Sequence, residues 1–502
     1  MSRAAKLCVP VALLALVGCS SETEPSASAD AGAESPVGGV LELDTASTVP
    51  ASDDPVRASD EPPTNDDAPT VAGGGPLPPV IDGTFDDWAG ITAGVTDAAG
   101  DATGPFDVLS LQGVCADGRL ALRLEITQAL NLQSGPEGEE TLVITVASAS
   151  DPDRSIGIDL RDRSVFSGVV NPIDWGVIDY VSAPTHASTV FEMAFDVSGL
   201  GVGRGGELVV AFAGSDTPDE VLRVRSERAP MTMRQEIDPR KQEEVFRVAS
   251  INTLRDGSAS TERGPLIGRM LDAMDPDIIC LQEERETSAG DLRSWIESHD
   301  PLDDGADWAV HKLAGNAILV PENLTVEVHP ASEDRFVIGL VGRSERPMIV
   351  ASIHLKCCGY IGSSEDKRRV REATAIVRAV ERIRAQDDEF SDAPFVLIGD
   401  WNLVGSGGAR DVVCDHPTLG AIDLAPMRLR GDRNSTWRDL TPNNGGFPPG
   451  RLDLVVVSRS LPVERSFVFD TMDLDESTLR GMGLEATDSS ASDHLMLVLD
   501  VP

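Results

Sequence analysis

Apolar residues in the second half of the chain recur in short runs, and each run ends in an acid, an amide or a histidine. Residues 246–251 lead to Asn252, and residues 278–281 lead directly towards Glu283. Runs of this length and composition, bounded by turn residues, are typical of buried strands. Between them, apolar residues at helical spacing predict helices. The pattern predicts an α+β domain over residues 245–502.

Residues 77–228 carry a different pattern, in which short β-like runs alternate with Gly, Asp and Pro. The clearest runs are residues 120–124, 141–146 and 208–212. This punctuation predicts an all-β antiparallel sandwich. The segment from Ile81 to Trp88 resembles the start of family 9-like carbohydrate-binding modules. The resemblance implies glycan contact through residues 77–228, and the alternative is a spacer domain whose Trp88 is packed in the core.

Residues 1–19 have the pattern of an export signal, with a basic start, an apolar stretch and a Leu-Val-Gly-Cys ending at Cys19. This ending resembles the lipobox of bacterial lipoproteins, which implies acylation of Cys19 and an otherwise soluble, membrane-anchored protein. Ser20 favours the outer over the inner membrane. We therefore expect a lipid-anchored protein of the bacterial cell envelope. The alternative is an ordinary cleaved secretion signal.

Two further stretches lack a pattern of buried positions. Residues 20–76 are acidic, contain no aromatic residue and are rich in Ser, Ala, Thr and Pro. Such a segment cannot bury enough apolar area to offset the entropy lost on ordering, so we expect a disordered linker. Residues 229–244 are polar with mixed charge and are expected to connect the sandwich to the last domain.

Acidic residues dominate the charge of the chain. The 83 Asp and Glu residues against 42 Lys and Arg residues give a formal net charge of −41. Such a surface repels nucleic acids and anionic membranes at long range. The composition argues against a dedicated nucleic-acid binder, but not against an enzyme that handles anions at a metal.

Five cysteines remain beyond the signal and the lipidation site: Cys115, Cys280, Cys357, Cys358 and Cys414. An oxidising envelope permits disulfides, and an odd number leaves at least one thiol free. Cys280 lies in an apolar run and is expected to be a small buried hydrophobe. Because Cys357 and Cys358 are neighbours and pair poorly with each other, we expect one of them to pair with Cys414.

The polar residues that end the C-terminal runs form a chemically coherent set. They are Asn252, Glu283, His354, Asp400, Asn402, Asp453, Asp493 and His494. Hard oxygen ligands beside two imidazoles, without a zinc-type Cys/His cluster, suit a Mg²⁺-assisted attack of water on a phosphate ester. A single residue of this kind is usually a turn residue, so the prediction depends on the whole set.

The order of these motifs resembles the endonuclease/exonuclease/phosphatase superfamily, the DNase I-like fold. The matching segments contain Asn252, the Leu-Gln-Glu ending at Glu283, the His-Leu at His354, Gly-Asp-Trp-Asn at 399–402, Arg-Leu-Asp at 451–453 and Ser-Asp-His at 492–494. The resemblance implies a four-layered α/β-sandwich and a metal-dependent phosphoesterase. One feature of DNase-like members is missing, because no acidic partner for His354 is found near Asn316.

The expected metal ligands are Asn252, Glu283 and Asp493. Their oxygen atoms suit Mg²⁺, with Mn²⁺ as the alternative. Adjacent strand residues face opposite ways, so Asp493 and His494 need a bend there to serve one site.

The remaining residues of the set are expected to act on water and phosphate. One of Asp400 and Asn402 accepts the proton of the attacking water, and the other orients the water or the phosphate. His494 is either the general base or a phosphate-contacting cation, oriented by Asp453. His354 is the second phosphate contact or the acid towards the leaving group.

Two basic clusters bear on substrate binding. One is the helix after residue 363, with Lys367, Arg368, Arg369 and Arg371, and the other holds Arg428, Arg430, Arg433 and Arg438. They line a groove for phosphates, or they are solvated surface. The expected substrate contacts are Arg285, Arg369 and Asn402.

The favoured hypothesis is an envelope-displayed, Mg²⁺-dependent phosphodiesterase acting as a nuclease. One alternative is a phospholipid-cleaving phosphodiesterase of the sphingomyelinase or phospholipase C type, which should expose a hydrophobic loop near the site. Another is a surface glycan-binding lipoprotein with a vestigial hydrolase domain. No obligate protein partner is inferred.

Overall fold

The computed structural model describes residues 78–132, 141–168, 171–218, 220–228, 237–302, 305–324, 326–342, 347–440 and 446–502. The chain divides into two units, Met1–Pro69 and Thr70–Pro502, and the described residues belong to the second. The predicted signal, the lipidation site Cys19, the acidic linker and the first half of the connector, residues 229–236, lie outside the described residues.

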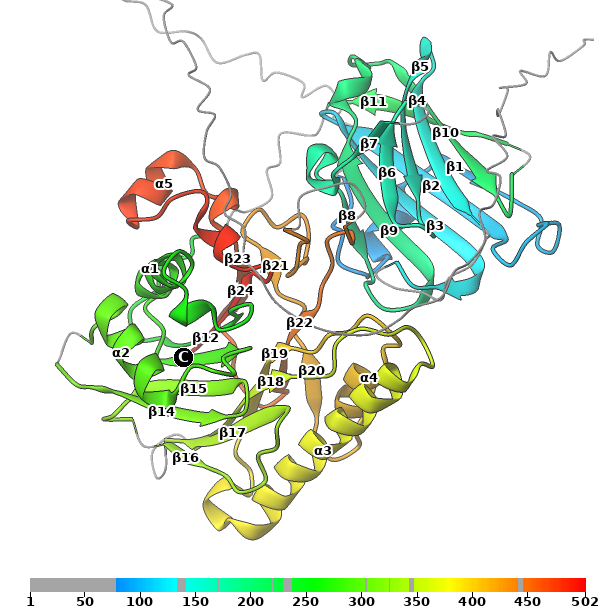
Figure 1. Cartoon of the computed structure of the whole chain (residues 1–502). Coiled ribbons are helices and arrows are strands. Elements are labelled where there is room, and N and C mark those ends of the chain that lie inside the picture. The colour runs from blue at the N-terminus through cyan, green and yellow to red at the C-terminus, as the bar shows by residue number, and fades with distance from the viewer. Residues whose placement is uncertain are drawn as a thin grey trace, which may run out of the picture. The chain divides into compact units, whose positions relative to one another are not determined.

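The C-terminal domain contains two sheets, and the first mixes parallel and antiparallel strands. Its order is β14 (Trp308–Leu313), β15 (Asn316–Pro321), β13 (Ile278–Gln282), β12 (Phe246–Asn252), β24 (Met496–Val501), β23 (Arg465–Phe469) and β21 (Met427–Arg428). Helices α1 (Gly264–Met274) and α2 (Ala289–His299) share one apolar cluster with this sheet (Figure 1). Pro265 in the first turn of α1 and the Ser288 cap of α2 begin the two helices in the usual way.

The second sheet has the order β16 (Val326–Val328), β17 (Phe336–Val341), β18 (Met348–His354), β19 (Phe395–Asp400), β22 (Asp453–Ser458) and β20 (Ala421–Asp423). Helices α3 (Ser364–Gln386) and α4 (Gly408–Cys414) pack on it with another apolar cluster. Ser363 caps α3 by accepting from Asp366 N, as the sequence predicts. The short α5 (Glu476–Gly481) precedes β24. Among the described helices, none combines the length and apolar character needed to cross a bilayer.

The two sheets pack face to face. Residues from both, including Val248, Val350, Ile398 and Leu497, form a single apolar cluster between them. Because both faces of each sheet are covered, the central strands are almost continuously apolar. Cys280 lies in this layer and is buried, as expected for a small hydrophobe. The predicted four-layered α/β-sandwich is confirmed.

The preceding region is all-β, as predicted. Its strands are β1 (Gly94–Thr96), β2 (Val108–Ala116), β3 (Arg119–Leu130), β4 (Leu142–Ser148), β5 (Asp151–Asp159), β6 (Ser164–Ser167), β7 (Asn171–Ile173), β8 (Val181–Ala183), β9 (Ser188–Asp196), β10 (Glu207–Gly214) and β11 (Leu222–Glu227). The groups β4–β7 with β10 and β11, and β1–β3 with β8 and β9, are joined by a short parallel pairing of β11 with β2. Both groups contribute to one apolar core, so the region is a β-sandwich.

Trp88, which ends the segment that resembles carbohydrate-binding modules, is packed in the sandwich. It is 2% exposed, and its Nε1 donates to Glu192 Oε2 over 2.8 Å. A ring in this position cannot stack on a sugar, so Trp88 fits the spacer alternative.

Hydrogen bonds and ion pairs join the sandwich to the C-terminal domain. Ile81 N donates to Asp432 O over 3.0 Å, and Trp175 Nε1 donates to Gly446 O over 2.7 Å. Arg433 donates to both carboxylate oxygens of Asp179 over 2.7 and 2.8 Å. These contacts fall on the segment that leads into β22, and a further hydrogen bond, from Ala187 N to Gly405 O over 2.8 Å, falls after β19.

The five cysteines named above are all free. The expected pairing of Cys357 or Cys358 with Cys414 is therefore wrong in this structure. Cys357 and Cys358 lie with their Sγ atoms 2.9 Å apart, next to Lys356, while Cys414 ends α4 on the outer layer.

Candidate active site

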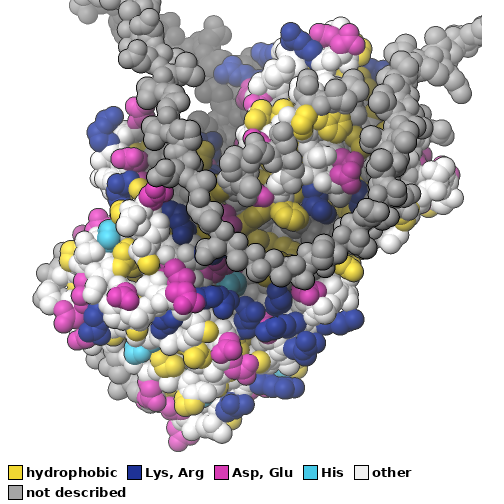
Figure 2. Space-filling view, in the orientation of Figure 1, with side chains coloured by type: hydrophobic (Ala, Val, Ile, Leu, Met, Phe, Trp, Pro, Cys, Tyr) yellow, Lys and Arg dark blue, Asp and Glu magenta, His cyan; other side chains and the backbone are white. Residues whose placement is uncertain are grey.

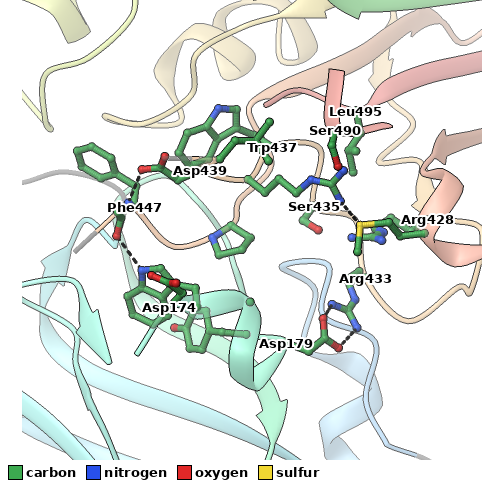
Figure 3. Close-up of a pocket in the computed structure, with 18 residues that line it drawn as sticks. Asp174, Asp179, Arg428, Arg433, Ser435, Trp437, Asp439, Phe447, Ser490 and Leu495 are labelled. Atoms are coloured by element: carbon green, nitrogen blue, oxygen red, sulfur yellow. Dashed lines mark hydrogen bonds and ion pairs between the residues drawn. The ribbon is translucent and has the colours of Figure 1, made fainter. Parts of the chain in front are cut away.

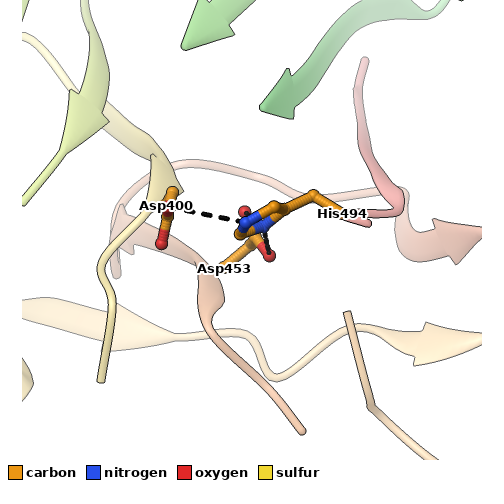
Figure 4. A group of neighbouring side chains, drawn as sticks. All are labelled: Asp400, Asp453 and His494. Carbon is orange, nitrogen blue, oxygen red and sulfur yellow. Dashed lines mark hydrogen bonds and ion pairs between the residues drawn. The ribbon is translucent and has the colours of Figure 1, made fainter. Parts of the chain in front are cut away.

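The strand ends of the second sheet bring ionisable side chains into one row. In the sheet register, His354 of β18 lies beside Asp400 of β19, and Asp400 lies beside Asp453 of β22. His494, just before β24, completes the group (Figure 4), with Nδ1 2.9 Å from Asp453 Oδ2 and Nε2 3.7 Å from Asp400 Oδ2. All four side chains are buried. The four residues are therefore direct neighbours.

Burial and mutual charge set the protonation of this group. Burial alone lowers the pKa of His494, but the carboxylates of Asp453 and Asp400 raise it to about 10. Burial, reinforced by Asp453, raises the pKa of Asp400 to about 7. At neutral pH His494 is an imidazolium that cannot accept a proton, whereas Asp400 titrates where a general base is effective. Of the two roles expected for His494, the electrostatics favour the phosphate-contacting cation.

The first sheet contributes Asn252 and Glu283 to the same place. Asn252 Nδ2 donates to Asp400 Oδ2 over 3.1 Å and to Glu283 Oε1 over 3.3 Å. Glu283 has a φ of 65°, a conformation that residues with a Cβ rarely adopt. Strain of this kind clusters at functional sites, where surrounding contacts hold it. Here it accompanies the turn that brings Glu283 out of β13 and against Asn252.

His354 faces two carboxylates. Its Nε2 lies 3.6 Å from Asp400 Oδ2 and 3.9 Å from Glu283 Oε1. The acidic neighbours of His354 thus come from the end of β19 and from the residue after β13, and not from β15, which begins at Asn316. Burial lowers the pKa of His354 to about 4 despite Glu283. As a neutral ring it can donate one hydrogen bond to a phosphate oxygen, but it adds no positive charge.

Asn402 orients Asp400. Its backbone N–H donates to Asp400 Oδ1 over 2.8 Å, and its Nδ2 donates to Asp400 Oδ2 over 2.9 Å. Its φ of 50° lies in the left-handed region that Asn tolerates. Three N–H groups, two from Asn402 and one from Asn252, therefore fix the Asp400 carboxylate.

Gln282 joins the two sheets directly beneath the group. Its Nε2 donates to Ser250 Oγ over 3.1 Å and to Ser352 Oγ over 2.9 Å, all in the buried interior. Gly399 makes this approach feasible, because a Cβ there would lie 2.3 Å from Ile353 O and 3.0 Å from Gln282 Nε2. Sequence reasoning missed both roles, although the two residues stand inside the quoted motifs.

Comparison with known proteins identifies this domain. Residues 249–494 match the model of the Endonuclease/Exonuclease/phosphatase family. The C-terminal domain belongs to that family. It is therefore a metal-dependent hydrolase of phosphoric esters. No curated protein matches the chain.

Solved structures similar to the chain include the human Nocturnin catalytic domain with bound sulfate anion, at 18% identity, covering 53% of this chain and 96% of that chain with a TM-score of 0.35. Another is the mannosyl-6-phosphatase Bt3783 of Bacteroides thetaiotaomicron VPI-5482, at 18% identity, 51% and 99% coverage and a TM-score of 0.36. A third is truncated TDP2 of Caenorhabditis elegans, at 18% identity, 52% and 98% coverage and a TM-score of 0.35. At these identities no substrate is carried over to this chain.

The donor set of this endonuclease/exonuclease/phosphatase domain fits a hard divalent cation. Glu283 is partly exposed, and the Arg255 N–H and His354 hold its pKa below its usual range against the effect of burial. Asn252, whose Nδ2 donates to Glu283 Oε1, also carries an amide oxygen, Oδ1. Carboxylate and amide oxygens are the ligands that Mg²⁺ prefers. Glu283 and Asn252 are the residues that would hold the cation.

Asp400, Asp453 and His494 also lie close enough together to hold a metal ion. Nδ1 of His494 is already committed to Asp453, however, and a protonated imidazole offers no lone pair to a metal. We therefore regard this group as the proton-handling part of the site.

Asp493 lies on the same segment as His494, but its carboxylate has other partners. Trp437 Nε1 donates to Asp493 Oδ2 over 3.0 Å. The bend expected here is present at Ser492 and Asp493, and Ser492 Oγ donates to Asn252 O over 2.6 Å. Asp493 is thus tied to the site through Ser492 and Trp437, and its role as a metal ligand stays a prediction.

The two predicted arginine contacts differ in position. Arg285 is exposed and close enough to His354 for its charge to lower the pKa of that ring. Arg369 is buried, and its Nη1 donates to Lys356 O over 2.8 Å and to Cys358 O over 2.7 Å. The expectation that Arg369 contacts substrate is therefore wrong, because its guanidinium holds the chain after β18 and does not reach solvent.

The second basic cluster is largely neutralised within the fold. Arg428 pairs with Asp470 and Asp473, and Arg438 also pairs with Asp470. Arg433 pairs with Asp179 of the sandwich. These arginines are structural and do not form an open phosphate groove. Elsewhere, Figure 2 shows Lys and Arg side chains gathered in a band across one face, interspersed with acids.

Two residues that sequence reasoning missed support the site. Thr436 Oγ1 accepts from the N–H groups of Leu452 and Asp453, each over 3.0 Å, and so fixes the start of β22. Arg335 lies near enough to His354 to lower its pKa. Thr436 stands in a Thr-Trp pair at 436–437 that belongs to the same family resemblance as Arg-Leu-Asp at 451–453, whereas nothing in the pattern around Arg335 marks it.

A cavity of about 440 Å³ is lined by both domains (Figure 3). The sandwich contributes Trp175 and Tyr180, and the catalytic domain contributes Trp437 and Phe447. Since Trp437 also donates to Asp493, the cavity lies one side chain away from the catalytic segment. The sandwich thus forms part of the wall next to the site.

Proposed function

We propose that this chain is a Mg²⁺-dependent phosphodiesterase that acts as a nuclease. The observation that supports this most is the position of Asp400. Its Oδ2 has His354, His494 and Asn252 as immediate neighbours, and Glu283 lies on the far side of Asn252. A base, an imidazolium and a hard-cation site within one group are what hydrolysis of a phosphodiester requires.

The residues divide the work as follows. Asp400 Oδ2, held by Asn402 and Asn252, accepts the proton of the attacking water. The imidazolium of His494, kept charged by Asp453, neutralises charge on the phosphate oxygens. The neutral ring of His354 donates a hydrogen bond to the same group. A divalent cation at Glu283 and Asn252 supplies Lewis-acid stabilisation when it is bound.

Among phosphodiesters, the site favours nucleic acid over phospholipid. Arg285 presents an exposed cation at the mouth, and none of the described residues forms an ion pair with it. A phospholipase should expose a hydrophobic loop. The exposed ring of Phe447 is covered on one face by Arg163, whose Cζ lies 5.3 Å from the ring centroid, whereas Tyr360 and Ile361 after β18 are exposed, so sphingomyelin is included in the test. We also propose that Cys19 is lipidated and holds the enzyme at the bacterial envelope, on the strength of the lipobox-like ending.

The experiment compares hydrolysis by the purified full chain of plasmid DNA, RNA, sphingomyelin and bis(p-nitrophenyl) phosphate, with Mg²⁺, with Mn²⁺ and with EDTA. We expect Mg²⁺-dependent cleavage of nucleic acid and of the small diester, and none with EDTA. Cleavage of sphingomyelin in preference to both nucleic acids would contradict the nuclease proposal. Cellular fractionation of wild type and Cys19→Ala tests the anchor, which should be lost from the membrane fraction in the variant.

A further inference from the structure

Two loops of the sandwich bring four aspartates together, away from the catalytic residues. Asp97, Asp101 and Asp107 lie on the loop between β1 and β2, and Asp216 follows β10. Oxygen atoms of Asp97, Asp101 and Asp216 all lie within 4.8 Å of one another. At neutral pH such a group is strongly self-repelling unless a cation neutralises it.

The two loops are held in contact, so the cluster is not a set of loosely placed surface acids. Thr103 N and Gly104 N both donate to Ser215 O, over 2.9 and 3.2 Å. Val108 N donates to Asp216 Oδ2 over 2.7 Å. The approach is so close that a Cβ on Gly104 would lie 2.5 Å from Ser215 Cβ. The fold therefore forces these carboxylates together.

Asp107 is the second and independent observation. It is 6% exposed, and its Oδ2 accepts from Gly100 N over 2.8 Å, so its carboxylate points at the loop that carries Asp101. Its Oδ1 is buried and has no hydrogen-bond partner among the described residues. A buried anionic oxygen without a donor is costly, and one on a side chain whose charge also acts on Asp101 of the cluster indicates a cation.

In the described part of the chain, no lysine or arginine neutralises this group of aspartates. None of the four aspartates forms an ion pair with a described lysine or arginine. Slight burial and repulsion from Asp97, Asp216 and Asp107 raise the pKa of Asp101. Asp101 is exposed and Asp97 is partly exposed, which leaves a path for an ion from solvent.

We propose that Asp97, Asp101, Asp107 and Asp216 bind a calcium ion that joins the two loops. The set contains only oxygen donors, with no histidine or cysteine, which excludes a zinc-type site. The carboxylates come from irregular loop positions, and Ca²⁺ accepts six to eight oxygens in flexible geometry, whereas Mg²⁺ demands a near-ideal octahedron. This site goes beyond the proposed nuclease function, because it concerns the sandwich and none of the catalytic residues.

The test uses the full chain, freed of metal with EDTA and dialysed, and calorimetric titration with CaCl₂. The background is Glu283→Gln, which weakens cation binding at the catalytic site. We expect one Ca²⁺ per chain, with a Kd of about 10⁻³ M or tighter, as in extracellular modules. In the same background Asp101→Asn should weaken binding about tenfold or more, since it removes one charged ligand. Asp153→Asn, which removes the same charge from an exposed position in β5, should leave the affinity unchanged.

Asp101 accepts none of the hydrogen bonds described above, so Asp101→Asn should fold normally. Thermal unfolding supplies the second readout: Ca²⁺ should raise the Tm of Glu283→Gln and of Asp153→Asn, but not that of Asp101→Asn at the same concentration. The proposal is overturned if millimolar Ca²⁺ does not bind in the Glu283→Gln background. It is also overturned if Asp101→Asn binds as tightly as its Asp153→Asn control, or if Mg²⁺ binds as tightly as Ca²⁺.

Discussion

The catalytic domain and the β-sandwich both gather carboxylates, but they neutralise them differently. In the catalytic domain, Asp453 and Asp400 keep His494 charged, and Asn252 and Asn402 donate hydrogen bonds to Asp400. In the part of the sandwich that the structure describes, the four clustered aspartates have no basic partner, and Asp107 Oδ1 has no hydrogen-bond donor. Where side chains supply the donors, a carboxylate can be poised to move a proton. Where they do not, the neutralising charge has to come from solution.

The largest effect should come from removing members of the catalytic group. Asp400→Ala and His494→Ala should each lower kcat for bis(p-nitrophenyl) phosphate about 10³-fold or more, because the base or the cation that faces the phosphate is lost. Circular dichroism should show an intact fold. Asp101→Asn, which alters a carboxylate of the other cluster, should leave kcat within about twofold of wild type. Near-wild-type turnover in both alanine variants would remove the distinction between the two clusters.

The pH dependence should follow the two catalytic groups in opposite directions. Since Asp400 must be deprotonated to accept a proton, kcat/KM should fall about tenfold per pH unit below its pKa of about 7. Since His494 must stay protonated, kcat/KM should also fall above its pKa of about 10. The positive charge of a cation bound beside Glu283 lowers the pKa of Asp400, so that the fall of kcat/KM on the acid side of the profile moves to lower pH. A profile with no acid limb would contradict the assignment of Asp400 as the base.

Alanine substitutions of Arg285 and Arg369 should distinguish a substrate contact from a residue that stabilises the fold. Arg285→Ala should raise KM for nucleic acid about tenfold without lowering the Tm, because an exposed phosphate contact is lost. Arg369→Ala should instead destabilise the fold by about 2–4 kcal/mol, because Lys356 O and Cys358 O lose their buried donor. Kinetics and denaturant unfolding of both variants check this. A raised KM with unchanged stability in Arg369→Ala would restore it as a substrate contact.

The smallest effect should come from the ion pair that joins the two domains. Asp179 is half-exposed, and Arg433 keeps Asp432 as a second partner. Asp179→Asn should therefore cost no more than about 1 kcal/mol and lower the Tm by only a few degrees in calorimetry, with kcat unchanged. A fall in kcat of more than about fivefold would show instead that the sandwich aligns the segment leading to Asp453.

The sequence predicted most of the catalytic group because its members lie at one edge of neighbouring strands, where His354 and Asp400 end β18 and β19 and Asp453 begins the antiparallel β22. His354, Asp400 and Asp453 occupy matched positions on three adjacent strands, so strand-end chemistry translates directly into spatial proximity. The prediction that Arg369 contacts substrate was wrong for a reason that the sequence itself shows. Arg369 stands four residues before Ala373 on the apolar stripe of α3, and helical spacing places it on the buried face.

Other features depend on contacts between distant segments and leave no local pattern. Arg428 and Arg438 look like free cations in sequence, but Asp470 reaches them from beyond β23. The sandwich aspartates come together only because the loop after β10 packs against the loop before β2. Protonation is equally hidden, since the charge of His494 follows from burial beside Asp453 and Asp400.

The proposed activity depends on strand ends from two sheets forming one cation-dependent hydrolytic site, and the Mg²⁺ dependence of Glu283→Gln tests this most directly. We predict that the variant is about 10²-fold slower than wild type on bis(p-nitrophenyl) phosphate at low Mg²⁺ and recovers in part at high Mg²⁺, because one charged ligand is missing. His494→Ala should not recover at any Mg²⁺ concentration. Identical Mg²⁺ dependence in wild type and Glu283→Gln would contradict the account.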